Sequence, residues 1–228
     1  MSAGAERRRP RTTARGGFTL PELLVAMAGA GLVLAGLVTF LVAGQQSFLV
    51  GANQIEAQQN VRIAIARLTD EIRGAGNGRP PRSPGDDPPP PPRPPAIAAG
   101  QTATSFTVQN DWNGNGTIDQ GVVVTVNGSL RGEQVTYSFA GGQLLRRESA
   151  VDNAAQPIVG GIQGLVFTYL DASGTKTDTP ENICSVVVTV QTRPETRQAA
   201  TYQQGGVVVT MTDTARIRNP GCEQRSGA

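Results

Sequence analysis

Histidine is absent from this chain of 228 residues. Its absence excludes Ser-His-Asp and Cys-His nucleophilic systems, HExxH metalloproteases and every zinc site that uses histidine. The remaining carboxylates, among them Asp171, Asp178 and Asp213, are spread along the chain without a paired nucleophile and are typical of turns and surfaces. The sequence therefore predicts a protein that is not an enzyme.

One segment has the spacing of a calcium-binding loop. It places oxygen-bearing side chains at EF-hand positions 1, 3, 5 and 9 and glycine at position 6. The candidate ligands are Asp111, Asn113, Asn115, Thr117 and Asp119. Val122 holds position 12, where a bidentate glutamate is expected, so the predicted affinity is only about 10⁻⁴–10⁻³ M unless Glu133 folds in as a further ligand. The alternative is an Asn-Gly turn held by Asx hydrogen bonds.

Residues 23–44 form an apolar run without a single charge. A helix of that length is about 33 Å long, enough to cross a hydrocarbon core of about 30 Å. Five arginines lie within residues 1–17 against one acid, whereas the rest of the chain carries 15 bases and 17 acids. The positive-inside rule then predicts a single-pass protein with a cytoplasmic N-terminus and an extracytoplasmic head. The balanced head predicts no direct contact with nucleic acid.

An exported head favours a disulfide between the two cysteines, Cys184 and Cys222. They enclose 37 residues, and closing a loop of that size contributes about 3–4 kcal/mol in the chain-entropy model. Two free thiols are the alternative. Because the pair lacks CxxC spacing, redox catalysis is not expected.

Glu22 lies at the very start of the apolar run. A carboxylate in that position is costly unless a cation neutralises it. In a lone membrane anchor, Glu22 would lie among the lipid headgroups in contact with water. In an assembly of helices, it would need a cationic partner.

These features resemble the type IV prepilin family, which includes the pseudopilins of type II secretion. The family pattern is a short basic leader ending in glycine, an aromatic residue after the cut, a glutamate at the fifth mature position and an unbroken apolar helix. Gly17, Phe18 and Glu22 hold these three positions. The resemblance implies that a prepilin peptidase cleaves after Gly17 and methylates the new amine to give N-methylphenylalanine at Phe18. It also implies that Glu22 pairs with the N-terminal amine of a neighbouring subunit during assembly.

Beyond the apolar run, apolar residues recur at helical spacing at Val61, Ile65, Leu68 and Ile72. The pattern predicts one helix from about residue 18 to residue 73, whose second half packs on a globular head. Residues 79–95 contain ten prolines in seventeen positions and predict a spacer, with a ligand for an aromatic-lined groove as the alternative. Seven short β-branched runs follow, at residues 104–109, 122–127, 134–139, 144–147, 165–170, 185–191 and 207–212.

The predicted fold is therefore α+β, with a pilin-like long N-terminal helix, transmembrane in its first half, packed on a mainly antiparallel sheet. The predicted organisation is a cytoplasmic leader (residues 1–17), the helix (18–78, spanning at 23–44), the proline-rich linker (79–95) and an extracytoplasmic β-rich head (96–228). Two Asn-Gly-Ser/Thr triplets, at Asn115 and Asn127, match the glycosylation sequon and are interpreted as accidental in a bacterial chain.

Four stretches of the head resemble minor pilins of the PilW type and related minor pseudopilins of the GspJ type. They are residues 133–137, 142–147, 159–169 and 215–219. The resemblance implies a subunit of a type IV pilus or a type II secretion pseudopilus, held first in the bacterial inner membrane. Its implied partners are the prepilin peptidase, other pilin subunits, the inner-membrane assembly platform and membrane lipid. The alternative is a membrane-tethered β binding module whose signal anchor is not cleaved.

Overall fold

The computed structural model describes residues 16–78, 94–195 and 207–218. The chain forms two compact units, Met1–Ser47 and Phe48–Ala228. One helix, α1 (Leu20–Gly74), contributes its first part to the first unit and its second part to the other. Most of the predicted proline-rich spacer and most of the predicted leader lie outside the described residues.

The first part of α1 is apolar and exposed. Every residue from 16 to 45 is exposed, including Leu32 at 78% and Phe40 at 75%. α1 is long and apolar enough to cross a membrane, and no residue of its apolar segment is buried against other parts of the protein. The described residues thus contain a single N-terminal helix compatible with a single-pass membrane anchor.

The second part of α1 is amphipathic and packs against the head, as predicted. Its buried side chains are Ala57, Val61, Ala64, Ile65, Leu68, Thr69 and Ile72. The helix ends where Arg73 and Gly74 precede Gly76, which adopts a φ of 77°. A basic residue in the last turn and a left-handed glycine after it are the usual features of a helix C-terminus. The helix predicted from about residue 18 to residue 73 is therefore correct to within two residues at each end, whereas the bound at residue 78 lies four residues beyond the end of the helix.

The described residues form nine strands in three antiparallel sheets. The first sheet has the order β1-β4-β5-β6, the second is the hairpin β2-β3, and the third has the order β7-β8-β9. Their bounds are β1 Ser105–Gln109, β2 Val123–Val126, β3 Ser129–Gly132, β4 Gln134–Ala140, β5 Gln143–Glu148, β6 Gln156–Val159, β7 Ile162–Leu170, β8 Ser185–Thr192 and β9 Val209–Arg216. A short 3₁₀ turn, Pro180–Asn182, precedes β8. The predicted mainly antiparallel α+β class is confirmed.

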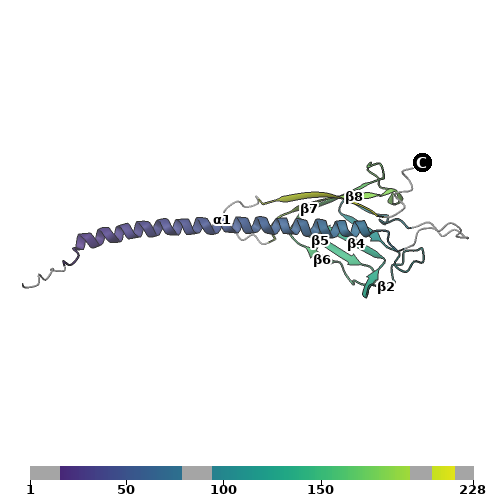
Figure 1. Cartoon of the computed structure of the whole chain (residues 1–228), viewed down its shortest axis with the longest axis horizontal. Coiled ribbons are helices and arrows are strands. Elements are labelled where there is room, and N and C mark those ends of the chain that lie inside the picture. The colour runs from purple at the N-terminus through teal and green to yellow at the C-terminus, as the bar shows by residue number, and fades with distance from the viewer. Residues whose placement is uncertain (1–15, 79–93, 196–206, 219–228) are drawn as a thin grey trace, which may run out of the picture. The chain divides into compact units, whose positions relative to one another are not determined.

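Both large sheets pack on the second part of α1, which lies between them in Figure 1. The Thr192 hydroxyl of β8 donates to the Ala57 carbonyl at 2.7 Å, and the Tyr137 hydroxyl of β4 donates to Glu71 at 3.1 Å. Phe106 stacks on Tyr137 and meets the edge of Phe167, with ring centroids 5.5 and 4.7 Å apart. One continuous core therefore joins the helix to the first and third sheets.

Seven of these strands lie at the predicted β-branched runs, with ends displaced by up to four residues. Neither β3 nor β6 is predicted from the sequence, because neither contains an alternating β-branched run. The Gly141-Gly142 turn joins β4 to β5, as predicted. Both glycines have positive φ, 60° and 77°, the geometry of a tight two-residue hairpin.

Candidate functional site

The residues of the prepilin-like pattern lie together at the start of α1. Gly17 and Phe18 precede the helix and are exposed, Phe18 by 86%. Glu22 lies in the first turn, where its carboxylate is 3.5 Å from both the backbone nitrogen and the hydroxyl of Thr19. A carboxylate in the first turn also interacts favourably with the helix dipole. Glu22 is thus held at the helix N-terminus, exposed beside a surface made of apolar side chains.

Residues 111–119 form a tight loop closed by side-chain oxygens. Asp111 accepts from the backbone nitrogens of Asn115 (3.0 Å) and Gly116 (2.8 Å). Asp119 accepts from the side-chain amides of Asn113 (3.0 Å) and Asn115 (2.7 Å). The loop therefore contains the Asx turns of the alternative interpretation, and it also directs its candidate calcium ligands toward one another.

Glu133 joins this loop from a separate segment, between β3 and β4. Its side chain has 0% exposure, and its two oxygens accept from the backbone nitrogens of Asn113 (3.3 Å) and Asp119 (2.7 Å). Within the described ranges, no three acidic or cysteine side chains converge into a formed metal-binding group. Of the six candidate ligands, three are carboxylates and the other three are two amides and Thr117. Glu133 thus adds a third carboxylate beside the two that the loop itself supplies.

The loop is joined directly to the end of α1. The backbone nitrogen of Gly76 donates to the backbone carbonyl of Gln109 at 2.8 Å. The backbone nitrogen of Asp111 donates to the backbone carbonyl of Asn77 at 2.9 Å. The Asn110 side chain accepts from the Asn77 backbone nitrogen at 3.0 Å. The first candidate ligand is therefore fixed to the turn that follows the helix.

A group of charged side chains beside the loop is not recognised from the sequence. Glu148 is 4% exposed, and its carboxylate accepts from Arg131 Nε and the Gly132 backbone nitrogen, both at 2.9 Å, and from Arg146. A terminal nitrogen of the Arg131 guanidinium also lies 3.7 Å from a carboxylate oxygen of Glu71 in α1. The central carbon of this guanidinium lies 5.4 Å from the ring centroid of Trp112 in the loop. From the sequence alone, these residues would be interpreted as ordinary surface charges on exposed strands. The fold instead uses them to tie the helix, the hairpin and the first sheet together.

Burial and neighbouring charges shift the pKa values of two side chains in this group, Tyr137 and Arg146. Burial raises the pKa of the Tyr137 hydroxyl well above its ordinary value, and the neighbouring Glu71 carboxylate raises it further. For Arg146, burial lowers the pKa, but the hydrogen bonds and charges of Glu148 and Tyr137 together outweigh burial, and the net pKa is raised. The phenol therefore stays protonated as a donor to Glu71, and the guanidinium stays charged.

Cys184 is disulfide-bonded and lies immediately before β8. Its carbonyl accepts from the backbone nitrogen of Ile217 at 2.9 Å, so the chain after β9 starts beside it. Cys222 follows Ile217 by five residues, a reach of about 17 Å for an extended chain, but lies outside the described residues. The pairing of Cys184 with Cys222 therefore remains a prediction.

Cys184→Ser should lower the free energy of unfolding of the full chain by about 3–4 kcal/mol, because the unfolded chain loses a cross-link over 37 residues. Denaturant unfolding of the protein in detergent measures the loss. Cys222→Ser and the double variant should lose the same amount. Additive losses from the two single variants would contradict the pairing.

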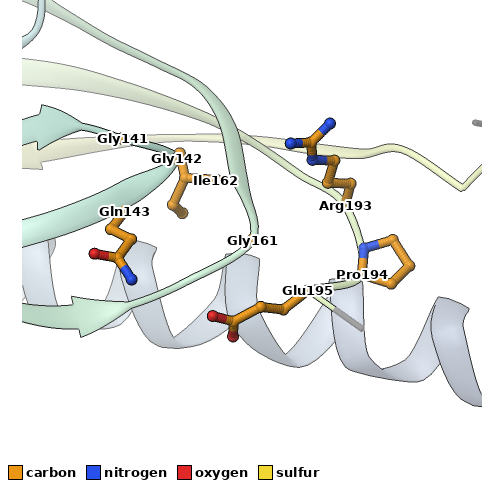
Figure 2. A pocket seen from close by; sticks show the side chains of 8 residues that line it. All are labelled: Gly141, Gly142, Gln143, Gly161, Ile162, Arg193, Pro194 and Glu195. Carbon is orange, nitrogen blue, oxygen red and sulfur yellow. The ribbon is translucent and has the colours of Figure 1, made fainter. Parts of the chain in front are cut away.

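A shallow pocket of about 180 Å³ lies among three turns of the head, shown in Figure 2. The Gly141-Gly142 turn, Gly161, Arg193 and Glu195 line it. A Cβ at Gly161 would lie 2.4 Å from the Arg193 carbonyl, so only glycine fits there. The lining contains no nucleophile and no paired acid and base, which gives it no evident chemistry.

Models of known protein families and the curated proteins give no match to this chain.

Proposed function

We propose that this chain is a minor pilin or pseudopilin. In this proposal, prepilin peptidase processes it and the mature subunit assembles into a type IV pilus or a type II secretion pseudopilus. The observation that carries the proposal is that Gly17, Phe18 and Glu22 lie at the start of one long helix whose two parts have different surroundings. Its first part exposes apolar side chains, and its second part is the core helix of a β head. The proposed role is assembly rather than catalysis.

The exposed apolar surface supports this proposal because it must be covered in any aqueous setting. Exposed side chains such as Leu32 and Phe40 would contact lipid tails before assembly and helices of other subunits afterwards. Glu22 is the only charged residue in this part of the helix. A carboxylate in such surroundings needs a cation, and the N-terminal amine of a neighbouring mature subunit would supply one. Because a misplaced subunit would leave the charge unpaired, Glu22 would set the axial register of the filament.

The proposed partners follow from these steps. They are the prepilin peptidase, other pilin or pseudopilin subunits, the inner-membrane assembly platform and membrane lipid. The arginine-rich segment within residues 1–17 would keep the N-terminus cytoplasmic until cleavage. The head would then lie outside the cytoplasmic membrane.

Mass spectrometry of the N-terminal peptide from the membrane fraction tests the proposal. The expected mature chain begins at N-methylated Phe18, and Gly17→Val should retain the leader because the residue before the cut is no longer small. Gly16→Val is the matched control, since a Cβ at either glycine meets no atom within 4 Å and neither change disturbs the fold. It should leave cleavage unchanged.

The rival function, a tethered β binding module with an intact signal anchor, makes the opposite prediction. It requires peptides from residues 2–15 in the stable wild-type protein. Their recovery, together with equal leader retention in the wild type and Gly17→Val, would overturn the pilin proposal.

A further inference from the structure

The loop of residues 111–119 is not explained by assembly into a filament. It concentrates side-chain oxygens from Asp111, Asn115 and Asp119 within nine residues. Gly116, at position 6, has a φ of 85°, which an EF-hand-like loop requires for its sharp turn. The sequence spacing and the folded backbone therefore agree with the same class of loop.

Glu133 is a separate indication that the loop holds a cation. It follows Asp119 by 14 residues, belongs to a different segment, and has a completely buried side chain whose two oxygens are directed at the loop. Buried carboxylates in proteins are paired with a cation or coordinate a metal, because removing an isolated charge from water is costly.

No arginine or lysine in the described part of the chain forms a salt bridge with Glu133, Asp111 or Asp119. Arg131, only two residues from Glu133, pairs instead with Glu71 and Glu148. Asp111 is itself only 3% exposed. The two carboxylates of the loop and the Glu133 carboxylate beside it thus have no counter-charge among the described residues, and two of the three are buried.

We propose that this loop binds one calcium ion and that Glu133 supplies the carboxylate missing from position 12. The amide groups of Asn113 and Asn115 now donate to Asp119, and rotation about the last side-chain bond would turn their oxygens toward a cation instead. Asp111 and Asp119 add carboxylate oxygens, and the backbone carbonyl of Thr117 holds position 7. A ligand from a separate segment replaces the one that an EF-hand takes from its own loop.

The ligand chemistry selects calcium among the common cations. Every candidate atom is an oxygen, whereas structural zinc sites use cysteine and histidine. Calcium accepts six to eight oxygens in flexible geometry, including amide and backbone carbonyls. Magnesium demands a nearly ideal octahedron and retains much of its water, which suits a loop of mixed amide and carboxylate ligands less well.

The test uses the full chain in detergent after removal of metal with EDTA. The chain contains one tryptophan, Trp112, which lies inside the loop and reports on it by fluorescence. Calcium chloride should change this fluorescence saturably, with a midpoint of about 10⁻⁴–10⁻³ M, and should raise the unfolding temperature. Glu133→Gln should weaken binding at least about tenfold, the loss typical of removing even an outer partner of a metal ligand.

Asp171→Asn is the matched control. Asp171 also closes an Asx-type turn, accepting from the backbone nitrogens of Ser173 and Thr175, but has no partner equivalent to Glu133. It should respond to calcium as the wild type does. Glutamine keeps the shape of the side chain but turns one of its two acceptor oxygens into a donor that faces a backbone nitrogen, so Glu133→Gln in EDTA should unfold somewhat below the wild-type temperature. The response to calcium is therefore measured for each variant against its own protein in EDTA. Asp119→Asn provides a second variant at a less buried ligand.

Three results would each overturn the proposal. The first is a wild-type protein whose fluorescence and unfolding temperature do not change with calcium up to about 10⁻² M, well above the weakest affinity expected of extracellular modules. The second is an unchanged calcium response in both Glu133→Gln and Asp119→Asn. The third is an equal response to magnesium at the same concentrations, which indicates charge screening instead of coordination. None of them affects the pilin proposal, whose test concerns residues 16–18.

Discussion

Glu148→Ala should destabilise the head by about 3–5 kcal/mol, the cost of removing one partner from a buried ion pair. The side chain of Glu148 is only 5% exposed, and it is the shared acceptor of Arg131, Arg146 and the Gly132 backbone nitrogen. Alanine removes the buried carboxylate that both guanidinium groups share and leaves Arg146 with only the longer pair to Asp152, at 3.5 Å. Arg131 retains Glu71 at 3.7 Å, but that pair is more exposed and contributes less.

Denaturant unfolding of the full chain in detergent, followed by Trp112 fluorescence, measures the loss. Glu148→Gln should cost less than alanine because an amide oxygen still accepts one hydrogen bond. Asp178→Ala changes an exposed acid on the same head and should stay within about 0.5 kcal/mol of the wild type. Equal losses for Glu148→Ala and Asp178→Ala would show that the buried pairs contribute nothing to stability.

The second large effect is expected at the helix face that the head covers. Leu68 has 0% exposure and lies in the core shared by α1 and the sheets. Leu68→Ala should lower the free energy of unfolding by about 2–5 kcal/mol, because it removes buried methyl groups and leaves a cavity that rigid sheets on both sides cannot close.

Ile63→Ala provides the control on the same helix. Ile63 is 49% exposed, so alanine removes little buried surface and slightly improves helix propensity. Its unfolding free energy should stay within about 0.5 kcal/mol of the wild type. If the same denaturant titration gave equal losses for the two variants, the assignment of the covered face would be wrong.

The helix could be predicted almost completely from the sequence, because its apolar run and its later amphipathic spacing are both local signals. Val61, Ile65, Leu68 and Ile72 are all buried, as their spacing predicted. The strands with alternating β-branched residues were also predictable, since a half-buried sheet face imposes a period of two. Their ends were less certain, because pairing with neighbours decides where a strand stops.

The two missed strands have identifiable causes. β3 pairs with β2 through a turn in which Asn127 and Gly128 have φ values of 51° and 78°. Asn-Gly is the strongest short hairpin signal, but the segment that follows it, Ser129–Gly132, contains no β-branched residue that would predict a strand. β6 contains Pro157 and therefore does not look like a strand, yet it is an edge strand, where a proline is tolerated.

The candidate loop was predictable in its local part only. The spacing from Asp111 to Asp119 is visible in the sequence, whereas no local pattern relates Glu133 to that loop. Its burial against the loop depends on the bend between β3 and β4 and on the hydrogen bond from Asn110 to its carbonyl, which no local pattern predicts. The burial of Glu148 likewise arises from the meeting of the hairpin with the first sheet.

The contacts between the helix and the sheets also determine the order in which the head can be completed. Glu71 meets a residue 66 positions later in the chain, and the carbonyl of Ala57 meets one 135 positions later. During synthesis, the apolar stripe of the helix therefore leaves the ribosome long before β8 exists to cover it. Such distant pairings make folding slow and leave apolar surface open to wrong contacts in the meantime. The nascent chain consequently has a long interval in which a chaperone or the membrane surface must protect its unfinished head.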